Sequence, residues 1–306
     1  MRFAVTARSS RGKRDRVQDN LVLDCFRKNW CHADLSLQIR PRSSNPSFSW
    51  PTSGLPTNEI KGYHVKEQGA YWFRPVLMRA LQTISASSMA HHGHDHAYAA
   101  VVLAGGYEEA GDHGRFQVAA GDVLLHDRFE AHLDRFSASG AVVLNLRLPA
   151  ESSFAPGAAK IADPDSIVSA AERSQTKAVN LLLSAIQPRA VMYADWPDEL
   201  AATLIDDPSL RLGRWAETKG LRAWTVSRGF AQVFGVSPEV FRVRARARQA
   251  WRLIQTSGCP LAQIAYHLGF ADQSHMTRGV KQLTRSTPRA WRAAANRYKT
   301  TPASRV

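Results

Sequence analysis

The C-terminal third of the chain contains the same unit twice, and this duplication constrains the fold more than any other feature of the sequence. Residues 216–221 (AETKGL) return as residues 265–270 (AYHLGF) at an offset of 49, and residues 226–230 (VSRGF) return as residues 276–280 (MTRGV) at an offset of 50. Each copy predicts a helix that ends at a glycine, a short connection, and a second amphipathic helix. The expected fold of this region is all-α, with two helix-turn-helix units.

A long helix is predicted between the two copies. Ser237, Pro238 and Glu239 supply an N-cap, a first-turn proline and an acid at the positive end of the helix dipole, and the helical pattern runs on to Gly258. About 20 residues at about 1.5 Å each give about 30 Å, close to the roughly 34 Å between successive major grooves on one face of B-DNA. We expect some arginines of this helix to make structural contacts. They are Arg242, Arg244, Arg246, Arg248 and Arg252.

The positive charge of the chain is concentrated in the same region. The whole chain carries +14, whereas residues 209–306 hold 18 Lys and Arg against 3 Asp and Glu, and residues 69–208 hold 10 against 17. A strongly basic domain attracts nucleic acid and gains affinity from counterion release. Double-stranded DNA is therefore the expected partner, and a solvated charged face is the alternative.

The second helix of each unit is expected to expose side chains that read bases. Arginine suits guanine, glutamine suits adenine, and serine and threonine hydroxyls reach bases or phosphates. Asp272 is expected to cap the helix of the second copy. The candidate DNA-binding residues are Trp224, Thr225, Ser227 and Arg228 in the first copy, and Gln273, Ser274, Thr277, Arg278 and Lys281 in the second. For Trp224, a place in the core is an equally weighted alternative.

Residues 211–292 resemble the DNA-binding domain of the AraC family of bacterial transcription regulators. The most specific stretches are IAxxLGFADQSHMTR at residues 264–278 and TPxxWR at residues 287–292. The resemblance implies two helix-turn-helix units that insert their second helices into adjacent major grooves. Two positions depart from the family pattern, because Arg285 stands where Gly is common and Val280 where Phe is usual.

The chain is expected to be a multidomain α and β protein. Residues 1–68 mix basic clusters with a Ser/Pro-rich stretch, which favours disorder, or they precede the true start of translation. Residues 69–150 read as a domain of many short strands. Residues 151–208 read as a helical connector, whose leucines pack within the chain or pair with a second copy in a homodimer. Residues 209–300 form the predicted DNA-binding domain and residues 301–306 a tail.

A histidine-rich segment lies before one of the predicted strands. The sequence HHGHDH at residues 91–96, together with GDVLLH at residues 121–126 and the following His132, is similar to the two signature segments of cupins. The resemblance implies a cupin-like β-barrel with His94, His96 and His132 in ligand-like positions, whereas the Glu position falls at about Ala100. Three interpretations stay open: an effector pocket without metal, a metal-assisted sensor, and a solvated histidine-rich loop.

These features predict a sequence-specific transcription regulator that binds DNA, responds to a small effector and is not an enzyme. RNA polymerase is a further expected partner if the protein is an activator. The alternatives are a metal-dependent cupin enzyme, a dioxygenase or isomerase, with an appended nucleic-acid module, and an architectural DNA binder. Ala100 argues against the enzyme because no carboxylate stands there.

Neither a membrane partner nor export is expected. The longest uncharged apolar run, residues 97–104, is far shorter than the roughly 20 residues that cross a bilayer. Three widely spaced cysteines, Cys25, Cys31 and Cys259, suit a reducing compartment better than a disulfide framework. A cytoplasmic location is predicted.

Overall fold

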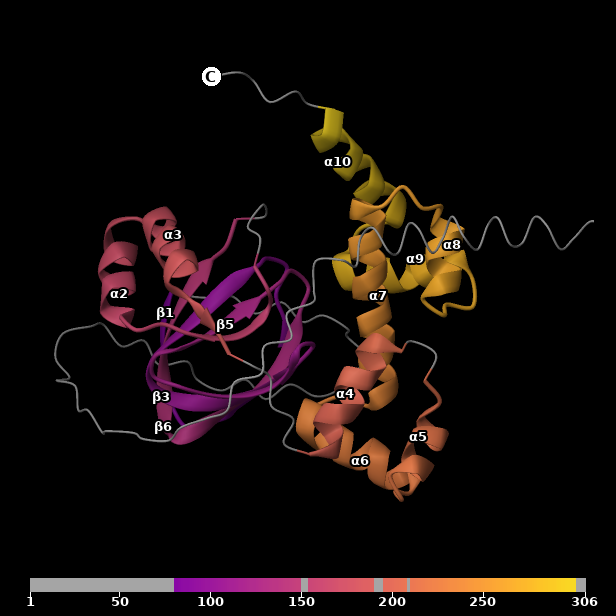
Figure 1. Cartoon of the computed structure of the whole chain (residues 1–306), viewed down its shortest axis with the longest axis horizontal. Coiled ribbons are helices and arrows are strands. Elements are labelled where there is room, and N and C mark those ends of the chain that lie inside the picture. Colours follow the sequence, from indigo (N-terminus) through magenta and orange to yellow (C-terminus); the bar gives the residue numbers. More distant parts are fainter. Residues whose placement is uncertain (1–79, 150–153, 190–194, 208–209, 301–306) are drawn as a thin grey trace, which may run out of the picture.

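The computed structural model describes residues 80–149, 154–189, 195–207 and 210–300. Figure 1 shows a strongly curved sheet with two helices on its outer side, beside a body that consists of helices. We refer to residues 80–189 as the sheet domain and to residues 195–300 as the helical domain. The predicted class, a strand-rich N-terminal part followed by helices with two helix-turn-helix units, is confirmed. The expectations for residues 1–68 and 301–306 lie outside the described residues.

The sheet domain is built on an antiparallel sheet of eight strands in the order β1-β6-β3-β5-β7-β8, with β2 also paired to β6 and β4 to β3. Its strands are β1 (Leu81–Ile84), β2 (Ser88–Gly93), β3 (Tyr98–Gly111), β4 (Gly114–Ala119), β5 (Asp122–His126), β6 (Ala131–Arg147), β7 (Gly157–Lys160) and β8 (Gln187–Pro188). β3 and β6 pair from Tyr98↔Arg147 to Gly111↔His132, and two register shifts interrupt this ladder. Such irregularities bend long strands, which accounts for the curvature.

The two faces of β3 bury different sets of side chains, as the period of two along a strand requires. Tyr98, Ala100 and Val102 belong to a core inside the curved sheet. Ala99 and Val101 belong to a core on the outer face, where α2 (Pro164–Arg173) and α3 (Gln175–Ala185) cover the sheet. The continuous apolar run at residues 97–104 thus reflects a strand that is buried on both faces.

The helical domain contains the two predicted units joined by a long helix. The first unit is α5 (Leu212–Thr218) and α6 (Ala223–Phe234), the connecting helix is α7 (Pro238–Thr256), and the second unit is α8 (Leu261–His267) and α9 (Gln273–Thr284). α10 (Pro288–Thr300) follows. The predicted start of α7 is confirmed, because the Ser237 side chain accepts a hydrogen bond from the Val240 backbone amide at 3.3 Å.

α7 contributes to both cores of the helical domain. Phe241 packs with Trp215, Phe230 and Phe234 in the first core, whereas Ala250, Trp251 and Ile254 pack with Ile264, Met276 and Leu283 in the second. A helix of 19 residues is about 28 Å long. The second helices of the two units are therefore held at opposite ends of one rigid helix.

The segment expected to be a connector is divided between the two domains. α2 and α3 lie on the sheet, and α4 (Trp196–Asp206) packs in the core of the first helix-turn-helix unit. Leu182, Leu200 and Leu204 are all buried within the chain. These three leucines pack within one chain, whereas Leu181 is 39% exposed, and pairing with a second copy stays a prediction.

Candidate nucleic-acid interface and histidine pocket

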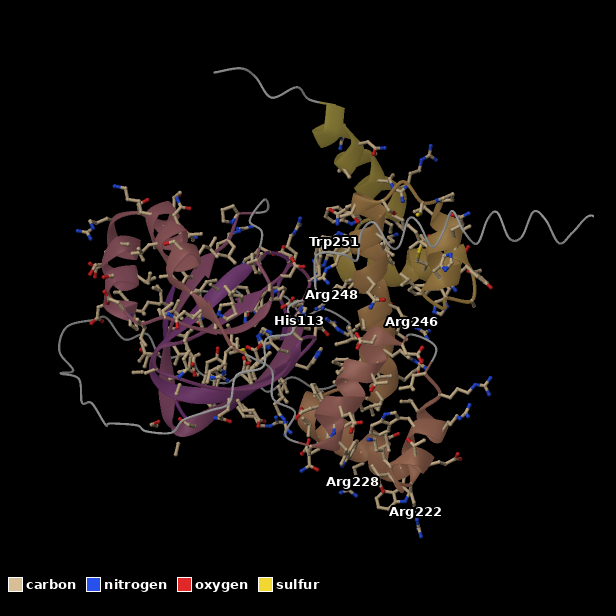
Figure 2. The ribbon with its side chains drawn as sticks, in the orientation of Figure 1. His113, Arg222, Arg228, Arg246, Arg248 and Trp251 are labelled. Atoms are coloured by element: carbon tan, nitrogen blue, oxygen red, sulfur yellow. The ribbon has the colours of Figure 1, made fainter. Side chains whose placement is uncertain are left out.

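α6 presents its predicted contact residues to the outside. Trp224 is 62% exposed, which excludes a place in the core, and Ser227 and Arg228 are also exposed, whereas Thr225 is partly buried. Val226 lies on the other side of the helix and is buried in the first core. Figure 2 shows Arg228 projecting away from the sheet domain.

α9 has the same arrangement. Asp272 caps the helix as predicted, because its side chain accepts a hydrogen bond from the His275 backbone amide at 2.6 Å. Thr277 is partly buried. The exposed residues among the predicted contacts are Gln273, Ser274, Arg278 and Lys281. Both helices therefore offer polar side chains that protein does not cover.

The two departures from the AraC pattern are accommodated differently. Val280 is fully buried in the second core. Arg285 ends α9 in the left-handed conformation, with φ 58°, and the equivalent residue of the first unit is Gly235, with φ 71°. A left-handed residue other than glycine costs about 1–2 kcal/mol, so the end of the second unit carries a strain that the first avoids.

The arginines of α7 are engaged within the chain. Arg242 donates to the Leu210 carbonyl at 2.8 Å and Arg246 donates to the Gly269 carbonyl at 3.0 Å. The other three form ion pairs with the sheet domain. These are Arg244 and Arg248 with Asp112, and Arg252 with Asp127. The expected structural contacts thus extend to all five arginines, although the Arg252 side chain remains 39% exposed.

Asp112 lies in the turn between β3 and β4 and is buried against α7. One of its carboxylate oxygens accepts from Arg248 at 2.9 Å, from Arg244 at 3.4 Å and from the Ala131 backbone amide at 3.0 Å. Burial alone would raise the pKa of Asp112, but the guanidinium groups of Arg248 and Arg244 hold this pKa below its ordinary value. The contact therefore depends on an ionised Asp112.

The sheet domain also contacts both helix-turn-helix units directly. Arg135 donates to the carbonyls of Gln232 and, at 3.0 Å, Val233 in the last turn of α6. Phe129 belongs to the core of the second unit, with its ring 5.0 Å from that of Trp251. Arg115 on β4 also pairs with Asp198 on α4 at 2.8 Å. The two domains are consequently joined at several places, and Figure 2 shows Arg248 and His113 at the boundary between them.

A cavity of about 50 Å³ lies inside the curved sheet. It is lined by three histidines, His92, His94 and His132, which each offer one ring nitrogen within 4.8 Å of the others. All three are buried. Burial lowers the pKa of His92 to about 4 and of His94 to about 3, and it also lowers the pKa of His132, so the rings are neutral at physiological pH.

His96, predicted to share this site, is not one of the three, although its ring centroid lies 6.0 Å from that of His94. Its Nδ1 pairs with the Asp95 carboxylate at 2.8 Å, and its side chain is 19% exposed. β2 ends at Gly93, and residues 94–97 form a turn before β3. Strict alternation would have placed residues 92, 94 and 96 on one face, but the end of the strand leaves only the first two together. His92 is the residue that the spacing argument missed.

Two buried carboxyl groups line the same cavity, although Ala100 supplies none. Glu109 on β3 pairs with Asp134 on β6 across the strands, and both line the pocket. Burial raises the pKa of Asp134 to about 8, and burial together with the neighbouring Asp134 raises the pKa of Glu109. Asp134 follows His132 at a spacing of two, so strand alternation was the signal that could have located it.

The polar groups of the cavity continue towards the domain boundary. His126 lies 3.5 Å from Glu109 and 3.5 Å from Glu130. Glu130 in turn lies 2.5 Å from His113 and 3.8 Å from Arg248 of α7. A row of ionisable side chains therefore links the pocket to α7, the helix that joins the two helix-turn-helix units.

The geometry defines a two-domain protein in which a sheet domain with an internal polar pocket is packed on a DNA-binding helical domain. The family model described as helix-turn-helix domain matches residues 215–294. These residues form an AraC-type helix-turn-helix domain, and the chain is a DNA-binding transcription regulator. No curated protein matches the chain significantly. No helix among the described residues is long and apolar enough to span a bilayer.

Several solved structures are similar to parts of the chain. ToxT from Vibrio cholerae is 10% identical, with 70% of this chain and 98% of that chain covered and a TM-score of 0.34. The C-terminal domain of AraT, a response regulator from Geobacillus stearothermophilus, is 20% identical, with 32% and 84% covered and a TM-score of 0.30. The DNA-binding domain of AdpA in complex with a target DNA is 24% identical, with 36% and 100% covered and a TM-score of 0.32.

Proposed function

We propose that this regulator reads a specific duplex sequence with α6 and α9 and responds to a small effector bound in the pocket of the sheet domain. The observation that carries the proposal is the exposure of equivalent faces in the two units, including Arg228 and Arg278 at the same position of each copy. Side chains that pack against nothing in the chain are free to enter a groove, and their chemistry matches base edges.

In this proposal each exposed residue has a distinct task. Arg228 and Arg278 bind guanine edges, and Gln273 binds an adenine edge. Trp224 contacts a thymine methyl group or a sugar. The hydroxyl and amino groups of the remaining predicted contacts bind bases or phosphates. These are Thr225, Ser227, Ser274, Thr277 and Lys281.

The proposal also covers the role of the sheet domain and the protein partners. The protein is a sensor rather than an enzyme, with His94 and His132 at the pocket and the predicted His96 in the turn between β2 and β3. A second copy in a homodimer, and RNA polymerase in the case of an activator, complete the set of partners. A DNA partner implies that the protein acts in the cytoplasm.

The test is selection of bound duplexes from a random pool, followed by gel shifts at fixed salt. Arg278→Ala should weaken binding to the selected duplex by about 1–3 kcal/mol and relax the preference at one base pair. Arg289→Ala is the matched control, because Arg289 is an exposed arginine on α10 rather than on α9. Full selectivity in the Arg278→Ala protein would remove the assignment of that arginine. A failure to select any sequence would contradict sequence-specific binding.

A further inference from the structure

The size of the pocket restricts what it can hold. Binding sites for organic ligands usually measure about 300–1,000 Å³, whereas this cavity measures about 50 Å³. A water molecule occupies about 30 Å³ of liquid. The space between the histidines and the carboxyl groups therefore suits an ion with one or two waters.

We propose that the pocket binds a divalent first-row transition-metal ion through His92, His94 and His132, with Asp134 as the adjacent carboxylate. Imidazole nitrogen is a preferred ligand of zinc, nickel and copper ions, and three imidazoles with one oxygen make a common four-coordinate set. The inference rests on the proposed function only for its regulatory consequence. The metal site itself depends only on the geometry of the pocket.

The spacing of the donor atoms agrees with a shared ion. The Asp134 Oδ2 atom lies 3.9 Å from His92 Nε2 and 3.8 Å from His132 Nε2. Neither distance is a hydrogen bond. Ligands about 2.0–2.1 Å from a tetrahedral ion lie about 3.4 Å from one another, so a contraction of a few tenths of an ångström would bring all three atoms onto one ion.

The surroundings of His92 fix which of its nitrogens faces the pocket. Its Nδ1 lies 3.0 Å from the Ala90 carbonyl oxygen. A carbonyl only accepts hydrogen bonds, so Nδ1 carries the proton and Nε2 presents its lone pair towards Asp134. Metal-binding histidines usually donate their second nitrogen to a carbonyl or carboxylate in this way. The Ala90 carbonyl thus orients His92 so that its Nε2 atom can act as a ligand.

One unpartnered oxygen of Asp134 points to the same conclusion. Within the described part of the chain, Oδ1 of Asp134 is buried without a hydrogen-bond partner, and a buried polar atom without a partner costs about 1–3 kcal/mol. An ion held by Oδ2 of the same carboxylate, or a water bound to that ion, would satisfy this atom. Nδ1 of His132 is also unpartnered, but it lies across the ring from Nε2 and the ion does not account for it.

Gly111 makes room for one of the ligands. A Cβ atom at residue 111 would lie 2.7 Å from the Cβ of His132, which faces it on β6. His132 lies two residues after Glu130 and three after Phe129, both of which contact the helical domain or its arginines. Capture of an ion by His132 would therefore act on the segment that joins the domains.

The experiment measures metal binding by the full chain produced without a histidine tag. After removal of metal with a chelator and titration with CoCl2, the wild-type protein should bind one equivalent of cobalt and show visible d–d absorption. Zinc should displace the cobalt and raise the melting temperature. His94→Gln and His132→Gln should each lower the affinity at least tenfold.

His96→Gln is the matched control, because His96 lies in the same segment but outside the cluster. It should bind cobalt as the wild type does. Each variant is first checked for wild-type binding to the selected duplex, so that misfolded protein is recognised. Absence of stoichiometric binding in wild-type protein that still binds DNA would overturn the metal site and leave the proposed function intact. Equal losses in His96→Gln and His94→Gln would overturn this choice of ligands.

A second possible group of metal ligands also includes His132, and the same cobalt titration distinguishes it from the proposed group. Glu109, His126 and His132 also offer atoms within 4.8 Å of one another. Asp134→Asn should change the cobalt spectrum and weaken binding, whereas His126→Gln should leave both unchanged. The reverse pattern would overturn the proposed set. Addition of zinc should change the affinity of the wild type for the selected duplex, and His94→Gln should abolish this response.

Discussion

Gly229 lies in the middle of α6, where glycine is unfavourable, and its absent side chain is what allows α4 to pack there. A Cβ atom at this position would lie 2.6 Å and 2.9 Å from two ring atoms of Trp196. The helix thus gives up about 1 kcal/mol of intrinsic stability relative to alanine so that an indole from the preceding segment can lie on its surface. The repeat located Gly229, but only the fold identifies what touches it.

We predict that Gly229→Ala lowers the stability of the protein. The gain in helix propensity is about 1 kcal/mol, whereas forced overlap in a packed site costs about 1–3 kcal/mol, and the Trp196 ring cannot move without disturbing the first core. Urea unfolding measures the difference. Gly213→Ala in α5 is the control, because a Cβ atom there meets nothing within 4 Å, and it should be neutral or stabilising. Stabilisation by Gly229→Ala would contradict the packing argument.

At the scale of elements, α7 serves as the attachment point of the sheet domain as well as the connection between the two units. Its pattern of alternating arginines resembles a DNA-facing surface in the sequence. In the fold, Arg244 and Arg248 are buried against Asp112, which lies more than 130 residues earlier in the chain. Local pattern cannot reveal a partner at such a separation, so a structural use of some of these arginines was predicted but their partner Asp112 was not.

Asp112→Asn should strongly destabilise the contact between the domains. The change keeps the shape of the side chain but removes the carboxylate that pairs with buried Arg244 and leaves Arg248 with Glu130 at 3.8 Å. Breaking a buried ion pair typically costs about 3–5 kcal/mol. Asp127→Asn is the control, because the pair of Asp127 with Arg252 is partly exposed and such pairs contribute about 0–1 kcal/mol. Equal effects of the two substitutions on the free energy of unfolding would contradict the structural role of Asp112.

At the scale of the whole molecule, the stability of the contact between the two domains should depend on pH through Asp112. Its folded-state pKa is below the ordinary value of 3.8, so its contribution to stability is present above that value and is lost as the pH falls through the lower folded-state pKa. We predict that the difference in unfolding free energy between wild type and Asp112→Asn is constant near neutrality and shrinks below about pH 4. A difference that stays constant down to pH 2 would show that Asp112 does not titrate in this contact.

Much of the architecture could be predicted because its signals are local. The cap at Ser237, the cap at Asp272 and the repeated glycines fixed the helices, and alternating apolar segments indicated the sheet. The pocket was predicted only in part. Spacing alone favoured His96, but β2 ends before it and leaves His92 in its place. Asp134 and Glu109 meet through strand pairing, and a pairing register is not visible in a single sequence.

If both units read DNA as proposed, their anchoring on one sheet domain constrains the operators that the protein can recognise. Arg135 fixes the first unit and Phe129 the second, so neither unit can turn by itself. One base pair inserted between the two recognised blocks rotates one block by about 35° around the duplex axis, and the protein cannot follow this rotation. Its operators should therefore diverge by base substitution while the number of bases between the blocks is preserved.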